Sequence, residues 1–238
     1  MKIRELTFHS KTEGNWISIS DLMSGLMMIF LFIAISYMQT IQEQISQIKE
    51  IAVAYEEIQD ELYVDLYDEF KDDLKRWNAE IDQETLSIRF NEPKVLFGQG
   101  SAEVTQKFNN ILHEFFPRYL DILYKDKYRT NIEEVRIEGH TSSEWTQNLS
   151  DERAYFLNMA LSQSRTCSVL ELCIGLVNDM DKREWVRKYI TANGLSSSRL
   201  VMNEDGTENE ERSRRVEFRT KTAAEKKVVE IIERMKKS

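Results

Sequence analysis

An apolar stretch near the start of the chain, residues 17–38, constrains the fold more than any other feature of the sequence. It is about 22 residues long, and a helix of that length crosses the roughly 30 Å hydrocarbon core of a bilayer. Gln, Thr, Ile, Gln and Glu follow Met38, so the small residues of a signal-peptide cleavage site are missing. We therefore expect one uncleaved transmembrane helix.

The basic residues around this stretch indicate its orientation. No Lys or Arg follows Met38 until Lys49, whereas three precede the stretch, namely Lys2, Arg4 and Lys11. Short loops rich in Lys and Arg stay on the cytoplasmic side of a membrane. Residues 1–16 are therefore expected to be cytoplasmic, and the chain after the span is expected on the opposite side.

Asp21 lies inside the apolar stretch, one helical turn from its start. A carboxylate deep in a bilayer costs about 2.5 to 3.5 kcal/mol on insertion scales. Ser18 and Ser24 lie three residues to either side and share its helical face, which can turn toward a partner helix or a water-filled path. There Asp21 can bind and release a coupled ion. The alternative is that Asp21 lies among the lipid headgroups, where it or Ser20 caps the first helical turn.

Residues 39–80 have the periodicity of a long amphipathic helix. Apolar side chains recur mostly every three or four residues, at Ile41, Ile45, Ile48, Ala52, Tyr55, Leu62 and Leu66. This near-heptad spacing predicts a helical stalk that pairs with a second copy of the chain, which makes a homodimer the expected state. The alternative is a helix that folds back onto its own domain.

The pattern changes after residue 80 to short strands and amphipathic helices, which predicts an α+β domain over residues 81–222. The predicted strands are residues 86–90, 135–139, 199–203 and 216–220. The predicted helices are residues 104–124, 158–176 and 182–191. Residues 145–156 are expected to form an enlarged loop or an early helix, and residues 223–238 a separate C-terminal helix.

Composition argues against several classes of protein. The formal net charge is -9, from 41 acidic and 32 basic residues, and such a surface repels phosphate, so no direct nucleic-acid partner is expected. The sequence has no nucleophile with a positioned base and no phosphate-binding loop, so we expect no enzyme and no cofactor. No residue spacing suggests a metal site, and His140 is interpreted as a satisfied structural histidine.

The two cysteines, Cys167 and Cys173, are too few for a disulfide framework. Their spacing of six residues would place them well apart along one helix, beyond the reach of a disulfide. We expect both to be core thiols, because free cysteine is usually buried. A disulfide between two copies of the chain is the alternative.

Four segments of the predicted domain carry a family resemblance. Residues 97–104 and 135–143 resemble the opening of an OmpA-like peptidoglycan-binding domain. Residues 158–165 are similar to the signature of that family, an Asn followed three residues later by Leu-Ser and then by Arg, and residues 209–217 resemble its closing motif. The resemblance implies a domain of βαβαββ type.

The resemblance also implies where the domain binds peptidoglycan. Arg165 would bind a stem-peptide carboxylate through the fixed geometry of its guanidinium group. The other implied site residues are Asn158, Leu161, Thr141 and Ser142. The Asp that the family usually has after Thr is Ser142 here, so the group that binds the amine is unassigned, and Glu144 or a backbone group could replace it. Leu161 could instead be a simple core residue and Asn158 a helix cap.

An acidic span, a stalk and a wall-binding domain together form the layout of the flagellar stator B subunit. Residues 16–27 and 139–145 resemble more closely component B of Zorya anti-phage defence systems. The resemblance implies a dimer in the bacterial inner membrane, with its domain in the periplasm. It would thread through a ring of multi-span A subunits and act indirectly on cytoplasmic effectors. Asp21 with Ser18 and Ser24 would couple the flow of H⁺, or of Na⁺, to rotation.

Two other functions fit the same layout. A motility stator would share the ion chemistry but drive movement, and its neighbouring genes would distinguish it from a defence protein. A passive anchor would tether the membrane to the wall without ion flow, so that Asp21→Asn would be harmless. The sequence alone leaves both alternatives open.

Overall fold

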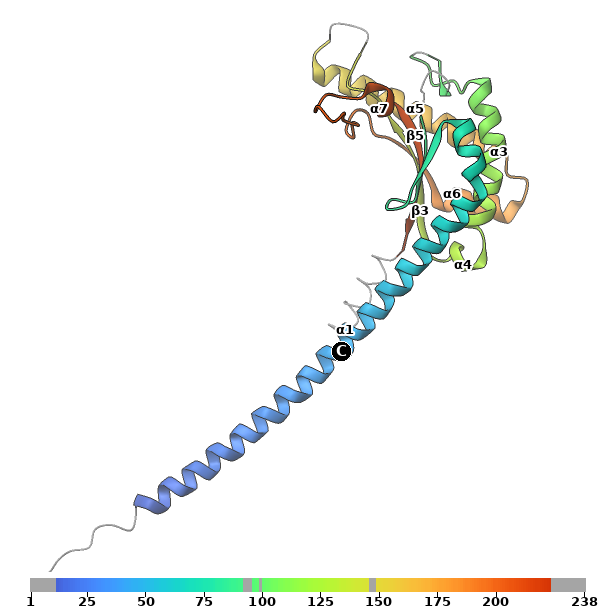
Figure 1. Ribbon diagram of the computed structural model, residues 1–238. Coiled ribbons are helices and arrows are strands. Elements are labelled where there is room, and N and C mark those ends of the chain that lie inside the picture. The colour runs from blue at the N-terminus through green and yellow to red at the C-terminus, as the bar shows by residue number, and fades with distance from the viewer. Residues whose placement is uncertain (1–11, 92–95, 99, 146–148, 224–238) are drawn as a thin grey trace, which may run out of the picture. The chain divides into compact units, whose positions relative to one another are not determined.

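The computed structural model describes residues 12–91, 96–98, 100–145 and 149–223, which form parts of two compact units (Figure 1). Unit 1 contains the N-terminal part of the chain up to Ile51, and unit 2 is Ala52–Glu230. Most of the predicted C-terminal helix, residues 223–238, lies outside the described residues.

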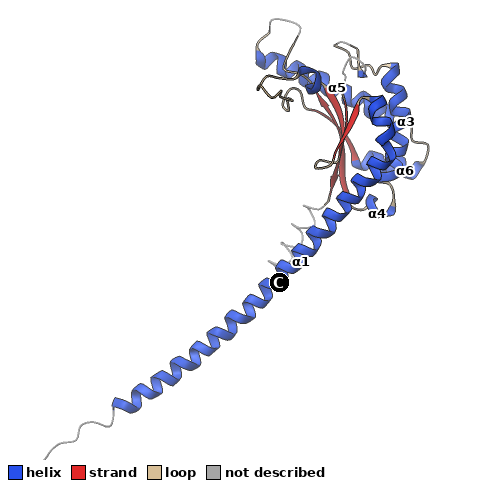
Figure 2. Ribbon diagram, viewed as in Figure 1, coloured by secondary structure: helices blue, strands red, loops and turns tan. Residues whose placement is uncertain are grey.

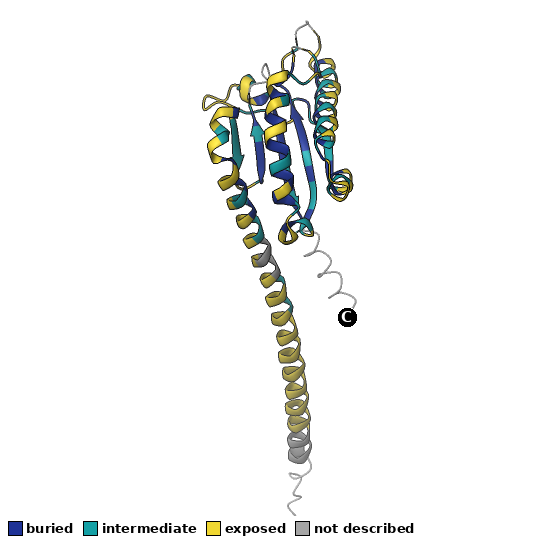
Figure 3. Ribbon diagram, turned by 90° about the vertical axis from the view of Figure 1, so that its right-hand side faces the viewer, coloured by how far each residue is buried: buried dark blue, intermediate teal, exposed yellow. Residues whose placement is uncertain are grey.

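Unit 1 consists of the first part of helix α1, Thr12–Trp77. The segment Ile19–Glu50 of this helix is long and apolar enough to cross a membrane, with a mean hydropathy of 2.0. Its apolar side chains are exposed within the chain, for example Leu22 and Met27, as expected of a helix whose surroundings are lipid or other helices (Figure 3). The described helix thus contains the predicted span.

The last part of α1 belongs to the core of unit 2. Leu62, Leu66 and Phe70 are fully buried there, whereas Ile45 on the earlier part of the helix is 59% exposed. The prediction that Leu62 and Leu66 lie on a seam between two copies is therefore wrong, because these side chains pack inside their own domain. The compact unit starts at Ala52, ahead of the predicted boundary at residue 81.

A five-stranded sheet forms the centre of unit 2. Its strands are β1 (Ala79–Asp82), β2 (Ser87–Phe90), β3 (Ile132–His140), β4 (Ile190–Gly194) and β5 (Arg215–Thr222). Their order is β1-β2-β5-β3-β4, in which β3 and β4 are parallel and the other neighbours antiparallel. The central strand β5 is thus the last of the five along the chain.

Two edge strands were not predicted, and one predicted strand is wrong. Strands β1 and β4 are short, and β4 starts directly after a helix, so residues 190–191 were assigned to that helix. Residues 199–203 form no strand, and only an isolated bridge between Met202 and Glu208 is found there. Both strands alternate apolar and polar residues, but only over four or five positions, which is too short for the alternation to identify a strand.

Helices pack against one face of the sheet (Figure 2). They are α3 (Gln106–Leu123), α4 (Asp126–Arg129), α5 (Asp151–Gly175) and α6 (Met180–Tyr189), while the short helix α7 (Glu210–Ser213) lies in the connection between β4 and β5. The order β2-α3-β3-α5-β4-β5 confirms the predicted βαβαββ-type α+β domain. Helix α5 starts seven residues before the predicted start at residue 158, because Ser150 caps it by accepting a hydrogen bond from the Arg153 N–H.

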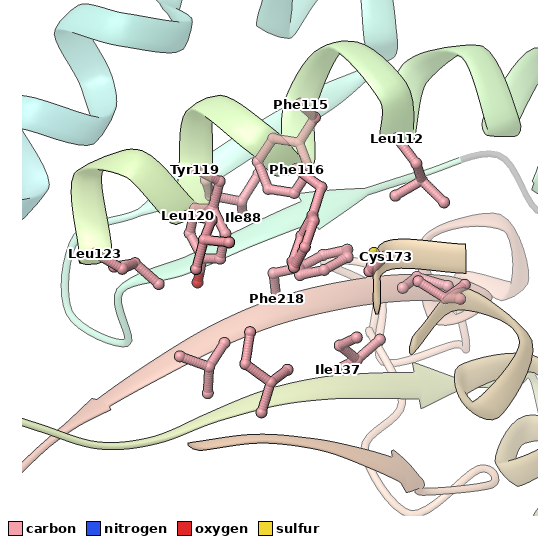
Figure 4. Close-up of a cluster of buried hydrophobic side chains, with 14 of the residues drawn as sticks. Ile88, Leu112, Phe115, Phe116, Tyr119, Leu120, Leu123, Ile137, Cys173 and Phe218 are labelled. Atoms are coloured by element: carbon pink, nitrogen blue, oxygen red, sulfur yellow. The ribbon is translucent and has the colours of Figure 1, made fainter. Parts of the chain in front are cut away.

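Aromatic side chains fill the space between the sheet and α3 (Figure 4). Phe218 on β5 meets Phe115 edge to face, with ring centroids 5.0 Å apart. The buried Tyr119 hydroxyl shares a 2.7 Å hydrogen bond with Thr220 on the same strand. This packing fixes the central strands, and β3 ends at a run of buried polar residues, His140, Thr141 and Ser142.

Candidate functional site

Asn158 fixes the loop after β3 to helix α5. Its side chain is only 3% exposed, and Nδ2 donates hydrogen bonds of 3.3 Å to the carbonyls of Ser142 and Glu144. Asn158 lies inside α5, which starts at Asp151 and has Ser150 as its N-cap, so the alternative of a helix cap is wrong. A buried amide that satisfies two loop carbonyls holds residues 142–144 in one place.

Two glycines let α5 approach the sheet closely. A β-carbon on Gly139 would lie 2.7 Å from Thr166 Cγ2, and one on Gly194 would lie 2.4 Å from the Gln163 nitrogen. The two glycines are neighbours in the β3–β4 register. Gln163 also accepts a 2.7 Å hydrogen bond from the Gly194 N–H. The position of α5 over the strand ends therefore depends on the absence of side chains at both positions.

Arg165 extends from this part of α5 toward the loop after β2. Its Nε donates to the Ser101 carbonyl at 2.8 Å, an Nη donates to the Gly98 carbonyl at 3.2 Å, and the guanidinium lies 4.9 Å from the Phe97 ring centroid. Among the described residues no carboxylate forms an ion pair with it. Burial lowers the pKa of Arg165, and the nearby charge of Arg214 lowers it further.

Thr141 and Ser142 follow β3 and are both buried. The Thr141 N–H donates to the Ser196 carbonyl at 2.9 Å, while its hydroxyl has no partner among the described residues. The Ser142 hydroxyl accepts a 3.3 Å hydrogen bond from Arg214, which also pairs with Glu210 at 3.2 Å. The position that usually carries an acid in the OmpA-like family is thus occupied by a hydroxyl that contacts a cation.

A small pocket adjoins these residues. Leu96, Phe97, Gly139, His140, Ser162, Arg165, Arg215 and Val216 line it. Of the five residues implied by the resemblance, Arg165 lines the pocket and Asn158 is bonded to the Ser142 backbone, while Leu161 is half-buried on α5 without a described polar contact. Sequence analysis missed Phe97 and Arg214, although both lie in segments that carry the resemblance.

A buried cluster of charged groups lies beside the pocket. Glu138 and Glu217 are cross-strand partners on β3 and β5, and His140 Nε2 lies 3.6 Å from Glu138 and 3.8 Å from Glu217. Three arginines pair with the two carboxylates: Arg199 with Glu138 at 3.1 Å, and Arg215 and Arg89 with Glu217 at 2.6 and 2.8 Å. Burial alone would raise the pKa of each carboxyl, but the cationic neighbours hold both below the usual value.

His140 does not have the hydrogen bonds expected of a satisfied structural histidine. Neither ring nitrogen has a hydrogen-bond partner among the described residues, and burial lowers the pKa of the imidazole. The cluster has three possible metal-ligand atoms within 4.8 Å of one another. Its carboxylate oxygens already accept hydrogen bonds from guanidinium groups, whose positive charge opposes a divalent cation. These residues therefore fit an ion-pair network better than a metal site.

Asp21 and Ser24 lie on the exposed surface of the apolar part of α1. The Ser24 hydroxyl donates a 2.8 Å hydrogen bond to the Ser20 carbonyl, one turn earlier. Ser18 belongs to the helix, but its side chain lies outside the described residues. Asp21 and Ser24 thus share an outward-facing surface, and their role in ion coupling stays a prediction.

No protein-family profile matches the chain. It is 46% identical over 230 residues to the Zorya protein ZorB of Escherichia coli, and the match covers 97% of this chain and 97% of the relative. The chain belongs to the ZorB family. This finding confirms the resemblance to component B of Zorya systems that residues 16–27 and 139–145 indicated.

Solved structures with similar folds cover about two thirds of this ZorB-family chain. A putative MotB-like protein from Desulfovibrio vulgaris is 20% identical, with a TM-score of 0.46, and covers 70% of this chain and 95% of its own. The cell wall anchor of the Pseudomonas aeruginosa T6SS is 23% identical, with a TM-score of 0.45, and covers 66% and 96%. The periplasmic domain of Helicobacter pylori MotB is 16% identical, with a TM-score of 0.41, and covers 63% and 85%. The family assignment rests on the E. coli ZorB.

The two cysteines of this ZorB-family chain have different environments. Cys173, on the inner side of α5, is fully buried in the core, and burial raises the pKa of its thiol. Cys167 is exposed, and its sulfur accepts a 3.4 Å hydrogen bond from Gln163. The prediction of a core thiol is confirmed for Cys173 and wrong for Cys167, because residue 167 lies on the outer side of α5.

Proposed function

We propose that the chain is the wall-anchored subunit of an ion-driven Zorya stator that acts in anti-phage defence. Its whole-length similarity to ZorB supports the defence role. The observation that carries the anchoring function is the environment of Arg165. Its half-buried guanidinium lines a pocket, and within the described residues it donates hydrogen bonds to backbone carbonyls. Such a group gains most from a ligand that brings its own carboxylate.

Peptidoglycan supplies that chemistry. Its stem peptides carry carboxylates, which match the planar guanidinium fork better than they match a single ammonium group. Asn158 positions the neighbouring loop, and the close approach of α5 to Gly139 and Gly194 fixes the helix that carries Arg165. A domain held in this way can keep the membrane-spanning helix from turning freely with the parts that rotate around it.

The motor function would depend on Asp21. We propose that two copies of the span pass through a ring of multi-span A subunits in the bacterial inner membrane, with residues 1–16 in the cytoplasm and the domain in the periplasm. Protonation of each Asp21 in turn would remove its charge and permit a step of the ring, because a neutral carboxyl crosses an apolar surface at lower cost. H⁺ is the proposed ion and Na⁺ the alternative. Cytoplasmic effectors would respond indirectly through the A subunits.

The test is phage protection in cells that carry the chain with its neighbouring genes. Asp21→Asn and Arg165→Gln are compared with wild type at matched membrane levels. Asp68→Asn and Arg153→Gln are the controls, because both residues are exposed and lie on the same two helices. We expect both test variants to lose protection and both controls to keep it.

The two variants separate the parts of the proposal when retention on isolated cell-wall sacculi is measured as well. Asp21→Asn should be retained like wild type. Arg165→Gln should bind sacculi at least about tenfold more weakly, which corresponds to a loss of about 1.4 kcal/mol or more in binding free energy. Full protection by Asp21→Asn would leave a passive anchor. Protection lost together with swimming of the host would instead favour a motility stator.

A further inference from the structure

We propose that Arg214 is a second ligand-contacting guanidinium, and that Arg165 and Arg214 select stem peptides by their free carboxylates and not by the amine. This inference rests on the proposed peptidoglycan-binding function and specifies the chemistry that the site recognises.

The first observation is the unneutralised charge of Arg165. Its described hydrogen bonds go to the carbonyls of Ser101 and Gly98, and its guanidinium covers the ring of Phe97. These contacts orient the group without cancelling its charge. The donors that remain can form a bidentate pair with a ligand carboxylate.

The second observation is the position of Arg214. Its Nη1 contacts the Ser142 hydroxyl at 3.3 Å and Glu210 at 3.2 Å, and its side chain is 31% exposed. Its charge reaches Arg165, whose pKa it lowers. The charge of Arg214 disfavours the charged form of Arg165, and a ligand carboxylate near both guanidinium groups would favour it.

The third observation concerns the groups in the loop after β3 that could bind the amine of a stem peptide. Thr141 and Ser142 present hydroxyls, and that of Thr141 is buried without a described partner. Two acids beside the loop have other contacts, since Glu210 pairs with Arg214 and Glu208 accepts hydrogen bonds from the N–H and hydroxyl of Ser143. The loop's own acid, Glu144, is exposed, and the position that usually carries the amine-binding acid in the OmpA-like family is the hydroxyl of Ser142.

The expected ligand is an acidic stem peptide whose diaminopimelate carboxylates are free. Amidation of those carboxylates would remove the charge that the two arginines recognise. Acetylation of the diaminopimelate side-chain amine would leave that charge in place. The two modifications thus distinguish carboxylate recognition from amine recognition.

The experiment measures binding of the detergent-solubilised full chain to three synthetic muropeptides: unmodified, amidated on diaminopimelate, and acetylated on its side-chain amine. For wild type we expect amidation to weaken binding at least tenfold and acetylation to change it less than twofold. Arg214→Gln should bind the unmodified peptide about as weakly as wild type binds the amidated one. Arg212→Gln is the matched control, because Arg212 lies on the short helix α7, two residues before Arg214 at its C-cap, and its side chain is 55% exposed.

Ser142→Asp provides a second variant that gains a function. An acid at this position would pair with Arg214 and offer an acceptor to an amine, so acetylation should now weaken binding several-fold. Far-UV circular dichroism and the melting temperature establish that each variant is folded.

The proposal is overturned if acetylation weakens wild-type binding more than amidation does, because Glu208 or Glu144 would then bind the amine. It is also overturned if folded Arg214→Gln binds like Arg212→Gln. If wild type binds no muropeptide and is not retained on sacculi, both the proposed anchoring function and this inference are wrong. Retention on sacculi without carboxylate discrimination overturns the inference alone.

Discussion

Glu138 and Glu217 face each other across the two central strands β3 and β5, an arrangement that is unfavourable for like charges. Arg89, Arg199 and Arg215 surround the pair and make it stable. His140 completes the cluster as a neutral, buried ring whose nitrogens lack described hydrogen-bond partners. The cluster therefore depends on the protonation state of groups that are buried together.

Acid should destabilise the domain in two stages. Burial lowers the pKa of His140 below its usual value of 6.5. Below pH 6.5 the unfolded chain therefore binds a proton at this residue more readily than the folded chain does. The stability present above pH 6.5 is lost as the pH falls below that value. The lowered pKa values of Glu138 and Glu217 add a second loss as the pH falls below about 4.5, where the unfolded carboxyls become protonated.

Urea unfolding of the full chain at pH 7.5, 6.5 and 5.5 measures the first stage. The contribution of one proton cannot exceed about 1.4 kcal/mol per pH unit. His140→Gln should flatten the curve between pH 7.5 and 5.5, while a replacement of the exposed His113 by Gln should not. An unchanged slope in His140→Gln would assign the pH dependence to other groups.

A single methyl group at residue 194 should disturb the proposed binding site. In Gly194→Ala the new β-carbon would lie 2.4 Å from the Gln163 nitrogen, so α5 must shift or the strand must bend, at a cost of about 1 to 3 kcal/mol. Because α5 carries Asn158 and Arg165, retention on sacculi should fall as well. Thermal unfolding and sacculus retention check both effects.

Gly175→Ala is the matched control for that experiment. Gly175 is the last residue of α5, and a β-carbon there would meet nothing within 4 Å. Alanine should leave stability unchanged or raise it by up to about 1 kcal/mol. Equal destabilisation of both variants would show that the close approach at Gly194 is not the cause.

The motifs in the sequence predicted the candidate site residues but not the contacts between residues far apart in the chain. Asn158 and Arg165 were expected because they stand in a recognisable order. The pairing of Glu138 with Glu217 and the contact between Arg214 and Ser142 join residues 79 and 72 positions apart, which no local pattern reveals. Cys167 was misplaced because a free cysteine is buried on average, whereas helical phase decides each case.

At the scale of secondary structure, the end of α1 has the largest consequences. Leu62, Leu66 and Phe70 pack into the core, and ion pairs flank them, such as Arg118 with Glu69 at 2.6 Å and with Asp73 at 2.7 Å. The periodicity that suggested pairing of two stalks was real, but a spacing of three and four marks any buried helical face. Only the fold identifies what covers that face.

Leu66→Ala should therefore destabilise the domain. Removal of a fully buried leucine side chain leaves a cavity and costs about 2 to 5 kcal/mol. The control is Val64→Ala on the same helix, where the side chain is 52% exposed and the change should stay within about 0.5 kcal/mol. Urea denaturation measures both differences. A dimer seam at Leu66 would instead change the monomer–dimer equilibrium and leave unfolding of the monomer unaffected.

At the scale of the whole molecule, the core sets the limits of the folding unit. The cluster of buried side chains includes Leu62, Leu66, Phe70 and Trp77 from α1 together with residues from every central strand. The α+β class and most of the central elements were predictable from apolar periodicity. The start of the unit was not, because α1 has the same helical pattern on both sides of residue 52.

Two truncated chains test that limit. A fragment of residues 52–223 should be soluble and unfold in one cooperative transition, since it contains every residue of the core cluster. A fragment of residues 81–223 lacks the four α1 residues and exposes the aromatic groups that they cover, so it should aggregate or melt at a much lower temperature. Equal melting temperatures of the two fragments would contradict this division.

Strand β5 lies in the middle of the sheet although it is the last of the described strands to be synthesised. When a growing chain has reached residue 200, β2 and β3 exist but have no partner between them, and Phe218 has not yet emerged to join the aromatic cluster. Pairing of strands far apart in sequence is a late event, and until it occurs apolar surface stays exposed to chaperones and proteases. A copy interrupted before β5 thus lacks the central strand of the sheet that carries the proposed wall-binding site.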